Sequence, residues 1–210
     1  MPQRAEPVLV IADGGLPSLV TMLMLDEPAR GIALFTGAGA DDSALRRRAT
    51  DLHVELAGLD RVDEPALAPD ALAPLAGGLG ESAMLLAAIA DAAERRCREV
   101  HWPRTADGDL DAMADAADRA LLVERLGVIE SARTGSLDVS LVTPLLDLDD
   151  QQIAELAADL AAPVWSCWWA LPEAADRADA SRERARWAER LRGLGAEALL
   201  APPAAEPAAV

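Results

Sequence analysis

A glycine pair in the segment Asp13-Gly14-Gly15-Leu16-Pro17-Ser18 is the feature of this chain best suited to chemistry. Backbone N–H groups in such a turn lie at the positive end of the dipole of the helix that follows. They therefore suit an anion such as a phosphate. A glycine pair is more often structural, because glycine supplies the backbone freedom that a tight turn needs. The segment is therefore a hypothesis for an anion site.

The elements around this turn are predicted from the local pattern. Val8 to Ala12 is an apolar, β-branched run typical of a buried parallel strand. Pro17 and Ser18 suit the first turn of a following helix, because proline needs no N–H there. Gly31 to Phe35 predicts a second buried strand, followed by the turn Thr36 to Gly39. The opening therefore predicts a βαβ unit.

The rest of the chain continues the alternation of strands and helices. We expect a helix from about Asp42 to Leu56 with Asp41 or Asp42 as N-cap, a long connection from Ala57 to Gly80, and a helix from Glu81 to Arg96. A strand from Glu99 to Trp102 follows, then a helix from the acidic loop Asp107 to Asp111 up to about Leu126, and a strand from Leu137 to Val142. The last two elements are a helix that Leu148-Asp149-Asp150 caps and that runs through Leu160, and an Arg-rich helix from Pro172 to Leu194.

This order predicts an α/β protein, a Rossmann-like three-layer sandwich with a mainly parallel sheet and helices on both faces. We expect one domain over residues 1–200, with a C-terminal helical segment at about 172–194 and a disordered tail at 201–210. Ligands of such sheets bind beyond the carboxyl ends of the strands. Asp13 to Ser18, Thr36 to Gly39 and Trp102 to Asp109 all follow strand ends.

The charge of the chain excludes some partners. Its formal net charge is −17, and all 19 basic residues are arginine. Nucleic acid is not expected as a partner, because binding its backbone needs a clustered positive field. No apolar run reaches the roughly 18 residues of a membrane span, and the N-terminal MPQRAEP has no apolar signal region. We expect a cytoplasmic protein that does not enter membranes.

The late part of the chain carries the most specific motif. Thr143-Pro144-Leu145-Leu146-Asp147-Leu148 precedes a helix that ends near Pro163, and Trp165-Ser166-Cys167 follows. With the glycine turn and the GIALFTG segment, this order resembles the PP-loop ATP pyrophosphatases, and within them 7-cyano-7-deazaguanine synthase of the queuosine pathway. The resemblance spans about residues 8 to 195. It implies an adenine nucleotide site with ATP and Mg²⁺, and ATP-dependent conversion of a 7-carboxy-7-deazaguanine to a nitrile.

The resemblance implies which residues would contact the nucleotide. They are Asp13, Gly14, Gly15, Leu16, Ser18, Phe35 and Thr36. No residue is assigned a catalytic role, and none is assigned to a metal.

The chain departs from the pattern of this family where the chemistry would occur. The family's loop reads Ser-Gly-Gly-x-Asp-Ser, so Asp13 replaces its first Ser and Pro17 replaces its Asp. A carboxylate at Asp13 repels a polyphosphate unless Mg²⁺ intervenes, and Pro17 offers neither an acceptor side chain nor an N–H. Before the third helix, Glu81-Ser82 stands where the family has Arg-Asn. Each change disfavours phosphate.

The zinc site of the family is also incomplete. Cys167 matches the first of its four zinc-binding cysteines, but the segment from Trp168 to Trp187 contains no Cys or His. Zinc is therefore not expected. The tryptophans Trp165, Trp168, Trp169 and Trp187 would replace the metal by apolar packing.

Several other polar residues are expected to be structural. For Asp147, a cap for the next helix is favoured over a substrate or metal contact, and Asp149 and Asp150 are interpreted as capping residues. His53 is expected to be solvated or hydrogen-bonded, and neither it nor His101 is assigned a role. Cys97 and Cys167 are interpreted as buried thiols. The run Ser181 to Arg192 predicts a solvated, ion-paired helix face, with phosphate binding as the minority alternative.

Three hypotheses for function follow. The first is a degenerate, catalytically impaired relative of 7-cyano-7-deazaguanine synthase with at most weak nucleotide binding, which we favour. The second is an active ATP-dependent C–N ligase of the PP-loop family that acts on another carboxylate. The third is a pseudoenzyme that acts through protein or oligomer interfaces. Candidate partners are an adenine nucleotide and a second copy of the chain.

Overall fold

A computed structural model of the chain describes residues 6–36, 41–62, 79–134 and 138–203. These residues form a five-stranded sheet in the order β3-β2-β1-β4-β5, and every neighbouring pair is parallel. The strands are β1 (Val8–Ala12), β2 (Gly31–Phe35), β3 (Asp60–Val62), β4 (Glu99–His101) and β5 (Ser140–Val142). The α/β fold predicted from the alternating pattern is confirmed.

The strand order places the glycine turn at a special position. β1 pairs with β2 on one side, from Val8 opposite Gly31 to Ala12 opposite Phe35, and with β4 on the other. The chain first moves outward through β2 and β3 and then returns to start again at β4. Ligands of open α/β sheets bind where the direction reverses, at the carboxyl ends of the strands. The turn after β1 is at this position.

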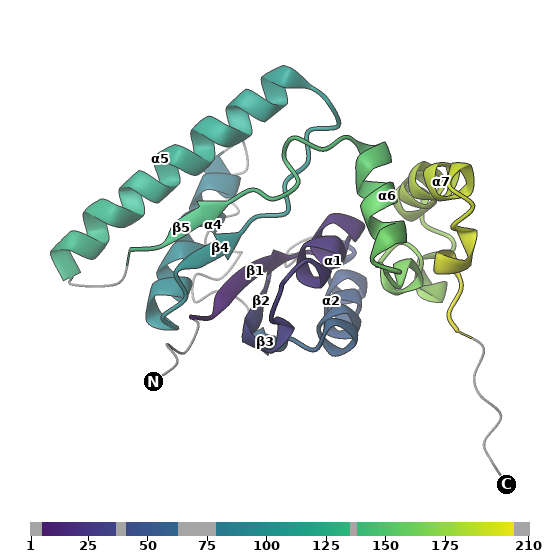
Figure 1. Ribbon diagram of the computed structural model, residues 1–210, viewed down its shortest axis with the longest axis horizontal. Helices are drawn as coiled ribbons and strands as arrows, with labels where there is room; N and C mark the ends of the chain where they lie inside the picture. Colours follow the sequence, from purple (N-terminus) through teal and green to yellow (C-terminus); the bar gives the residue numbers. More distant parts are fainter. Residues whose placement is uncertain (1–5, 37–40, 63–78, 135–137, 204–210) are drawn as a thin grey trace, which may run out of the picture.

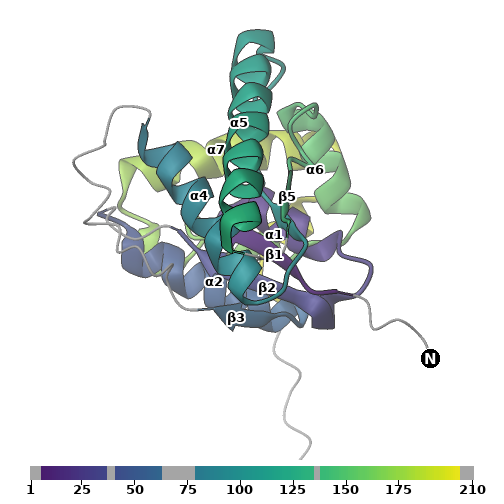
Figure 2. The same cartoon turned by 90° about the vertical axis from the view of Figure 1, so that its left-hand side faces the viewer.

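Helices cover both faces of the sheet (Figures 1 and 2). The helices α1 (Leu16–Leu23) and α2 (Ser43–Ala57) pack on one face, and α4 (Leu79–Glu94) and α5 (Leu110–Thr134) pack on the other. Alternation along β1 explains this, because Val10 belongs to the apolar cluster under α1 and α2 while Leu9 and Ile11 belong to the cluster under α4 and α5. The three-layer sandwich is confirmed.

The C-terminal part adds helices outside α1, seen at the far side of Figure 1 from α5. Its elements are α6 (Asp150–Asp159), α7 (Ala178–Gly193) and short 3₁₀ turns at Val164–Ser166, Pro172–Ala174 and Glu197–Leu200; an earlier 3₁₀ turn, Pro28–Arg30, precedes β2. Trp168, Trp169 and Trp187 are buried in one apolar cluster with residues of α1 and α6. The expected aromatic packing is confirmed for these three, whereas Trp165 stays partly exposed.

Three predicted boundaries are wrong. β3 lies inside the stretch expected to be a connection, because a three-residue strand that begins with Asp60 and Arg61 has no apolar run to reveal it. α5 continues to Thr134 instead of ending near Leu126, since Gly127 lets the helix approach Ile89 of α4. α7 begins at Ala178, because Pro172 starts a separate 3₁₀ turn.

Two further predictions reach beyond the described residues. The strand expected from Leu137 is described from Ser140 to Val142, and residues 135–137 lie outside the described ranges. Of the tail at 201–210, the last seven residues, 204–210, lie outside them too. Within the part of the chain that the structure describes, no helix is both long enough and apolar enough to cross a membrane.

Asp149 and Asp150, both predicted to be capping residues, have different roles at the start of α6. Asp149 is the N-cap, and its carboxylate accepts from the Gln152 N–H at 2.8 Å in a capping box, as predicted. Asp150 is not a cap: it is 1% exposed and its carboxylate binds Arg186 and Arg190 of α7, the latter at 2.8 Å. The ion-paired arginine face predicted for α7 is confirmed for these two arginines, whose side chains stay 33% and 27% exposed, but their partner is a buried carboxylate and they tie α7 to α6.

Candidate functional site

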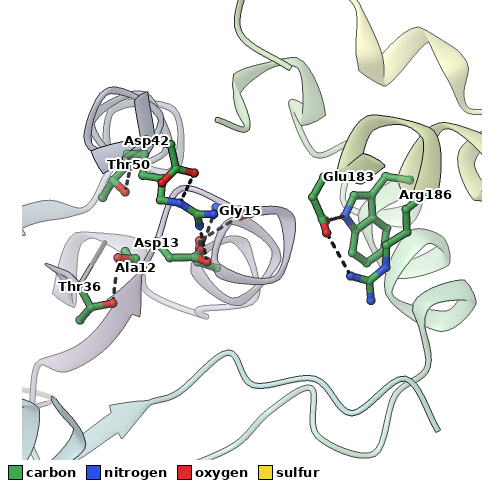
Figure 3. Close-up of polar contacts among 11 residues, drawn as sticks. Ala12, Asp13, Gly15, Thr36, Asp42, Thr50, Glu183 and Arg186 are labelled. Atoms are coloured by element: carbon green, nitrogen blue, oxygen red, sulfur yellow. Dashed lines mark hydrogen bonds and ion pairs between the residues drawn. The ribbon is translucent and has the colours of Figure 1, made fainter. Parts of the chain in front are cut away.

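The glycine turn after β1 is a closed hydrogen-bonded unit (Figure 3). Gly14 has a φ of +76°, a left-handed conformation that favours glycine, and α1 begins at Leu16. The Gly15 N–H donates to Oδ1 of Asp13 at 2.9 Å. The Ser18 hydroxyl lies 3.1 Å from the same oxygen and 2.9 Å from the Gly15 carbonyl oxygen. The donors expected to face an anion are directed at the carboxylate of Asp13.

An arginine completes the surroundings of this carboxylate. Nη1 of Arg46, from α2, lies 3.3 Å from Oδ2 of Asp13, and its Nε lies 2.7 Å from the Asp42 carboxylate. The same guanidinium stacks over the Trp168 ring, 4.3 Å from its centroid. Arg46 is therefore held by two carboxylates and one aromatic face, although its side chain stays 23% exposed and that of Asp13 49% exposed.

The turn is also covered by backbone from two distant segments. A Cβ at Gly14 would lie 2.5 Å from the Arg46 carbonyl oxygen and 2.9 Å from Cβ of Ala49, so no larger residue fits. The Gly14 carbonyl oxygen accepts a hydrogen bond from the Trp168 N–H at 2.9 Å. Gly14 is thus packed between α2 and the segment that follows Trp165-Ser166-Cys167.

The other predicted contact residues share this edge of the sheet but differ in exposure. Thr36 follows β2 beside the turn, and its N–H donates to the Ala12 carbonyl oxygen at 2.9 Å. Leu16 and Ser18 are fully buried. Phe35 is 1% exposed and lies under the guanidinium of Arg47, 5.3 Å from its ring centroid. Residues 37–40 of the expected second turn lie outside the described ranges.

A second charge cluster lies where α4 starts and β4 ends. Glu81 of α4 lies 3.6 Å from Arg104, in the loop after β4, and 3.5 Å from Arg119 of α5. Arg119 also donates to the Ser82 hydroxyl at 2.7 Å. The residues that stand where the family pattern has Arg-Asn thus pair with arginines of their own chain.

Comparison with known proteins assigns this chain to no family. No protein-family model matches the chain, and no curated protein is similar to it. The resemblance described above therefore rests on the quoted sequence motifs alone.

The buried thiol and imidazole near the turn are not set up as reactive groups. Burial raises the pKa of the Cys167 thiol well above its usual range, and the charges of Asp13 and Glu183 raise it further. His53 of α2 is fully buried, and burial lowers its pKa to about 3; the Ser166 backbone opposes this shift without completing a hydrogen bond. The expectation that His53 would be solvated or hydrogen-bonded is wrong.

The remaining candidates lie away from the turn. Burial raises the pKa of Cys97 to about 11. His101 lies 3.1 Å from Glu99 and lines a small cavity with Val8, at the start of β1 and not at its end. Asp147 is exposed in the turn before α6, and the capping role favoured for it belongs to Asp149.

In residues 6–36, 41–62, 79–134 and 138–203, no cluster of three or more His, Cys, Asp or Glu side chains could hold a metal ion. A cavity of about 510 Å³ lies between α6 and α7. Four of its eight lining residues are acidic, among them Asp107, Asp149 and Glu189, and its one arginine, Arg190, is paired with Asp150, so it does not suit a phosphate.

Sequence reasoning missed the partners of Asp13. Asp42 and Arg46 are four residues apart on a helix, a spacing that favours an ion pair and could have drawn attention to Arg46. The contact with Trp168 joins residues more than a hundred positions apart, and no local pattern indicates it.

Proposed function

We propose that this chain is a degenerate, catalytically impaired relative of the PP-loop ATP pyrophosphatases, similar to 7-cyano-7-deazaguanine synthase, with at most weak nucleotide binding. A cytoplasmic location belongs to the same proposal. The observation that carries it is the position of the Asp13 carboxylate, which takes the hydrogen bonds that a bound phosphate would take in such a loop.

The charges around the loop support this interpretation. A phosphate entering the turn would have to displace a carboxylate that is covalently part of the chain, and it would meet the negative charge of Asp13 at close range. Arg46 cannot compensate, because Asp42 and Asp13 already neutralise it. At the neighbouring edge, Glu81 forms ion pairs with both Arg104 and Arg119. Arg46, Arg104 and Arg119 are thus already paired with carboxylates of their own chain.

The relationship to the family is supported by which segments meet. The glycine turn and the segment after Trp165-Ser166-Cys167 lie far apart in sequence, but the Trp168 N–H binds the Gly14 carbonyl oxygen. The two motifs that carry the resemblance are therefore joined at one place in the fold. A degenerate family member would retain this packing after the loop had lost its ligand.

The variant Asp13→Ser tests the proposal, because it returns the first residue of the family's loop. It frees the Gly15 N–H, the Ser18 hydroxyl and one side of Arg46. We expect no calorimetric binding of Mg-ATP to the wild type below about 1 mM, and at least about tenfold tighter binding to Asp13→Ser, equivalent to about 1.4 kcal/mol.

The sign of this effect separates two roles of Asp13. If the carboxylate instead holds Mg²⁺ for a nucleotide, Asp13→Ser weakens binding, and the proposal is wrong. Asp26→Ser is the matched control: it makes the same change of charge at an exposed site after α1, and we expect unchanged binding. Micromolar binding of Mg-ATP by the wild type would also contradict the proposal.

Catalysis is tested separately. We expect no pyrophosphate release from ATP with 7-carboxy-7-deazaguanine and ammonia. Release that is lost in Ser18→Ala would instead support the active enzyme. Release with a different carboxylate would support the alternative of an active PP-loop ligase.

A further inference from the structure

The outer face of α5 carries a dense group of exposed apolar side chains. Five of them lie within nine positions of one helix, with exposed fractions from 40% to 66%: Leu121, Leu122, Leu126, Val128 and Ile129. A single exposed leucine is ordinary, but a contiguous patch of this kind marks an interaction surface. We call these five residues the α5 patch.

The inner face of the same helix explains why the large residues point outward. α5 packs on α4 through small side chains, and Ala116, Ala120 and Val123 are buried there. Gly127 lies so close to α4 that a Cβ would be 2.9 Å from Ile89. Because the close packing on α4 uses the small residues, the leucines are left on the opposite side, where they are exposed. In Figure 2 the helix α5 faces the viewer, with no other described element in front of it.

The exposed charges of α5 include one acid and one base on a single stripe. Asp111, Asp115 and Asp118 are exposed in its first half, and Arg125 and Glu130 are exposed in its second half. Asp118 and Arg125 are seven residues apart, two helical turns, and therefore lie on one stripe. Leu121 and Leu122 lie between them, one on each side of that stripe.

This arrangement is self-complementary in the antiparallel direction. If two copies of α5 meet antiparallel about a two-fold axis between Leu121 and Leu122, Leu121 of one copy contacts Leu122 of the other. Asp118 of each copy then meets Arg125 of the other, and Ala114 meets Ile129. A two-fold interface requires one patch that fits itself, and a patch with its own acid and base at equal distances from the axis does so.

The size of the surface is sufficient for a specific contact. α5 has 25 residues and is therefore about 37 Å long. Two copies of the α5 patch with their flanking charges bring on the order of 1,000 Å² into contact, which is the lower bound for a stable interface. We propose that the outer face of α5 is the interface of an antiparallel homodimer. This inference does not depend on whether the chain binds a nucleotide.

The first test is the oligomeric state by sedimentation equilibrium. The full chain is expected to be dimeric at roughly 10–100 µM, a range that detects micromolar affinity. Leu122→Glu places two carboxylates beside the axis and should raise the dissociation constant about 100-fold or more. Leu56→Glu is the matched control, because Leu56 is 44% exposed on α2, which packs on the other face of the sheet, and should leave the dimer intact.

The second test uses charge reversal to examine the register. Asp118→Arg and Arg125→Asp each place like charges opposite each other and should be monomeric alone. Mixed together, they should form a one-to-one heterodimer, because every contact then joins opposite charges. The double variant with both changes should be a homodimer again. Circular dichroism checks that each variant remains folded.

Three results would overturn the inference. They are a wild type that stays monomeric at 100 µM, a dimer that Leu122→Glu leaves intact, and single charge variants that do not recover each other on mixing. None of these results would alter the calorimetric test of Asp13, so the two proposals fail independently.

Discussion

His53 is held in the interior of the protein in its neutral form. It is fully buried between α2 and the segment at Ser166, and neither ring nitrogen has a hydrogen-bond partner in the described part of the chain. Charging this imidazole would place an uncompensated positive charge away from water, which is why burial lowers its pKa to about 3. The unfolded chain binds the same proton at its ordinary pKa of about 6.5.

The free energy of unfolding should therefore decrease as the pH falls. Because the folded pKa lies below the unfolded one, stability is lost as the pH falls below about 6.5, at about 1.4 kcal/mol per unit, until the folded pKa is reached. Between pH 7.5 and 5 the loss from this residue is about 2 kcal/mol. Urea unfolding of His53→Leu should lack this component, whereas His101→Gln, which changes the other histidine, should retain it. Equal pH dependence of wild type and His53→Leu would contradict the assignment.

Helices α6 and α7 are joined by one buried carboxylate. Asp150 lies at the start of α6 with 1% exposure, and it meets Arg186 and Arg190, whose side chains remain 33% and 27% exposed. The arginines are one turn apart on α7 and approach the carboxylate from the same side. The side-chain hydrogen bond to Asp150 is the main cause that raises the pKa of Arg186, so this guanidinium keeps its charge.

Removing the two arginines should lower the free energy of unfolding more than removing the charge of Asp150. Arg186→Ala with Arg190→Ala leaves Asp150 buried without a counter-charge and should lower the free energy of unfolding by about 3–5 kcal/mol. Asp150→Asn should cost less, because the two guanidinium groups can turn towards water. Chemical denaturation measures both. Arg182→Ala, an exposed arginine of the same helix, is the control and should change stability by less than about 0.5 kcal/mol.

Among the helices and strands, the sequence predicts the positions of those that have a local pattern of their own. β1, β2, α1 and α6 were located within a residue or two, because each has an apolar pattern, a glycine turn or a capping box of its own. β3 was missed, since a short strand is selected by pairing with β2 and not by its own composition. The length of α5 was underestimated for a related reason: its second half is stabilised by packing on α4.

The whole molecule consists of the sandwich and a C-terminal helical part that an aromatic cluster attaches to it. Trp187 of α7 is 1% exposed, and its Nε1 donates to Glu183 at 3.1 Å. Trp168 and Trp169 lie in the same cluster with residues of α1 and α6. Burial of these large side chains attaches α6 and α7 to the sandwich.

Chelation should therefore have no effect on the stability of this chain. We expect EDTA to leave the melting temperature unchanged, whereas Trp187→Ala should lower the free energy of unfolding by about 3–5 kcal/mol. Differential scanning calorimetry with and without chelator checks both statements. One zinc per chain by elemental analysis, with a melting temperature that falls in EDTA, would show that a metal holds this part.

The sequence by itself determined the order of the helices and of four of the five described strands, the position of the glycine turn at the end of β1, and the apolar character of the tryptophan segment. Each of these depends on residues close together in the chain, where spacing and residue type are sufficient. Only the tertiary structure decided that the Asp13 carboxylate accepts the hydrogen bonds of its own turn and that Arg46 pairs with it while stacking on Trp168. It also decided that Asp150 is a buried ion-pair partner and not a cap. Those properties depend on which distant segments pack together and on which charges lose their water, and neither can be obtained from local pattern.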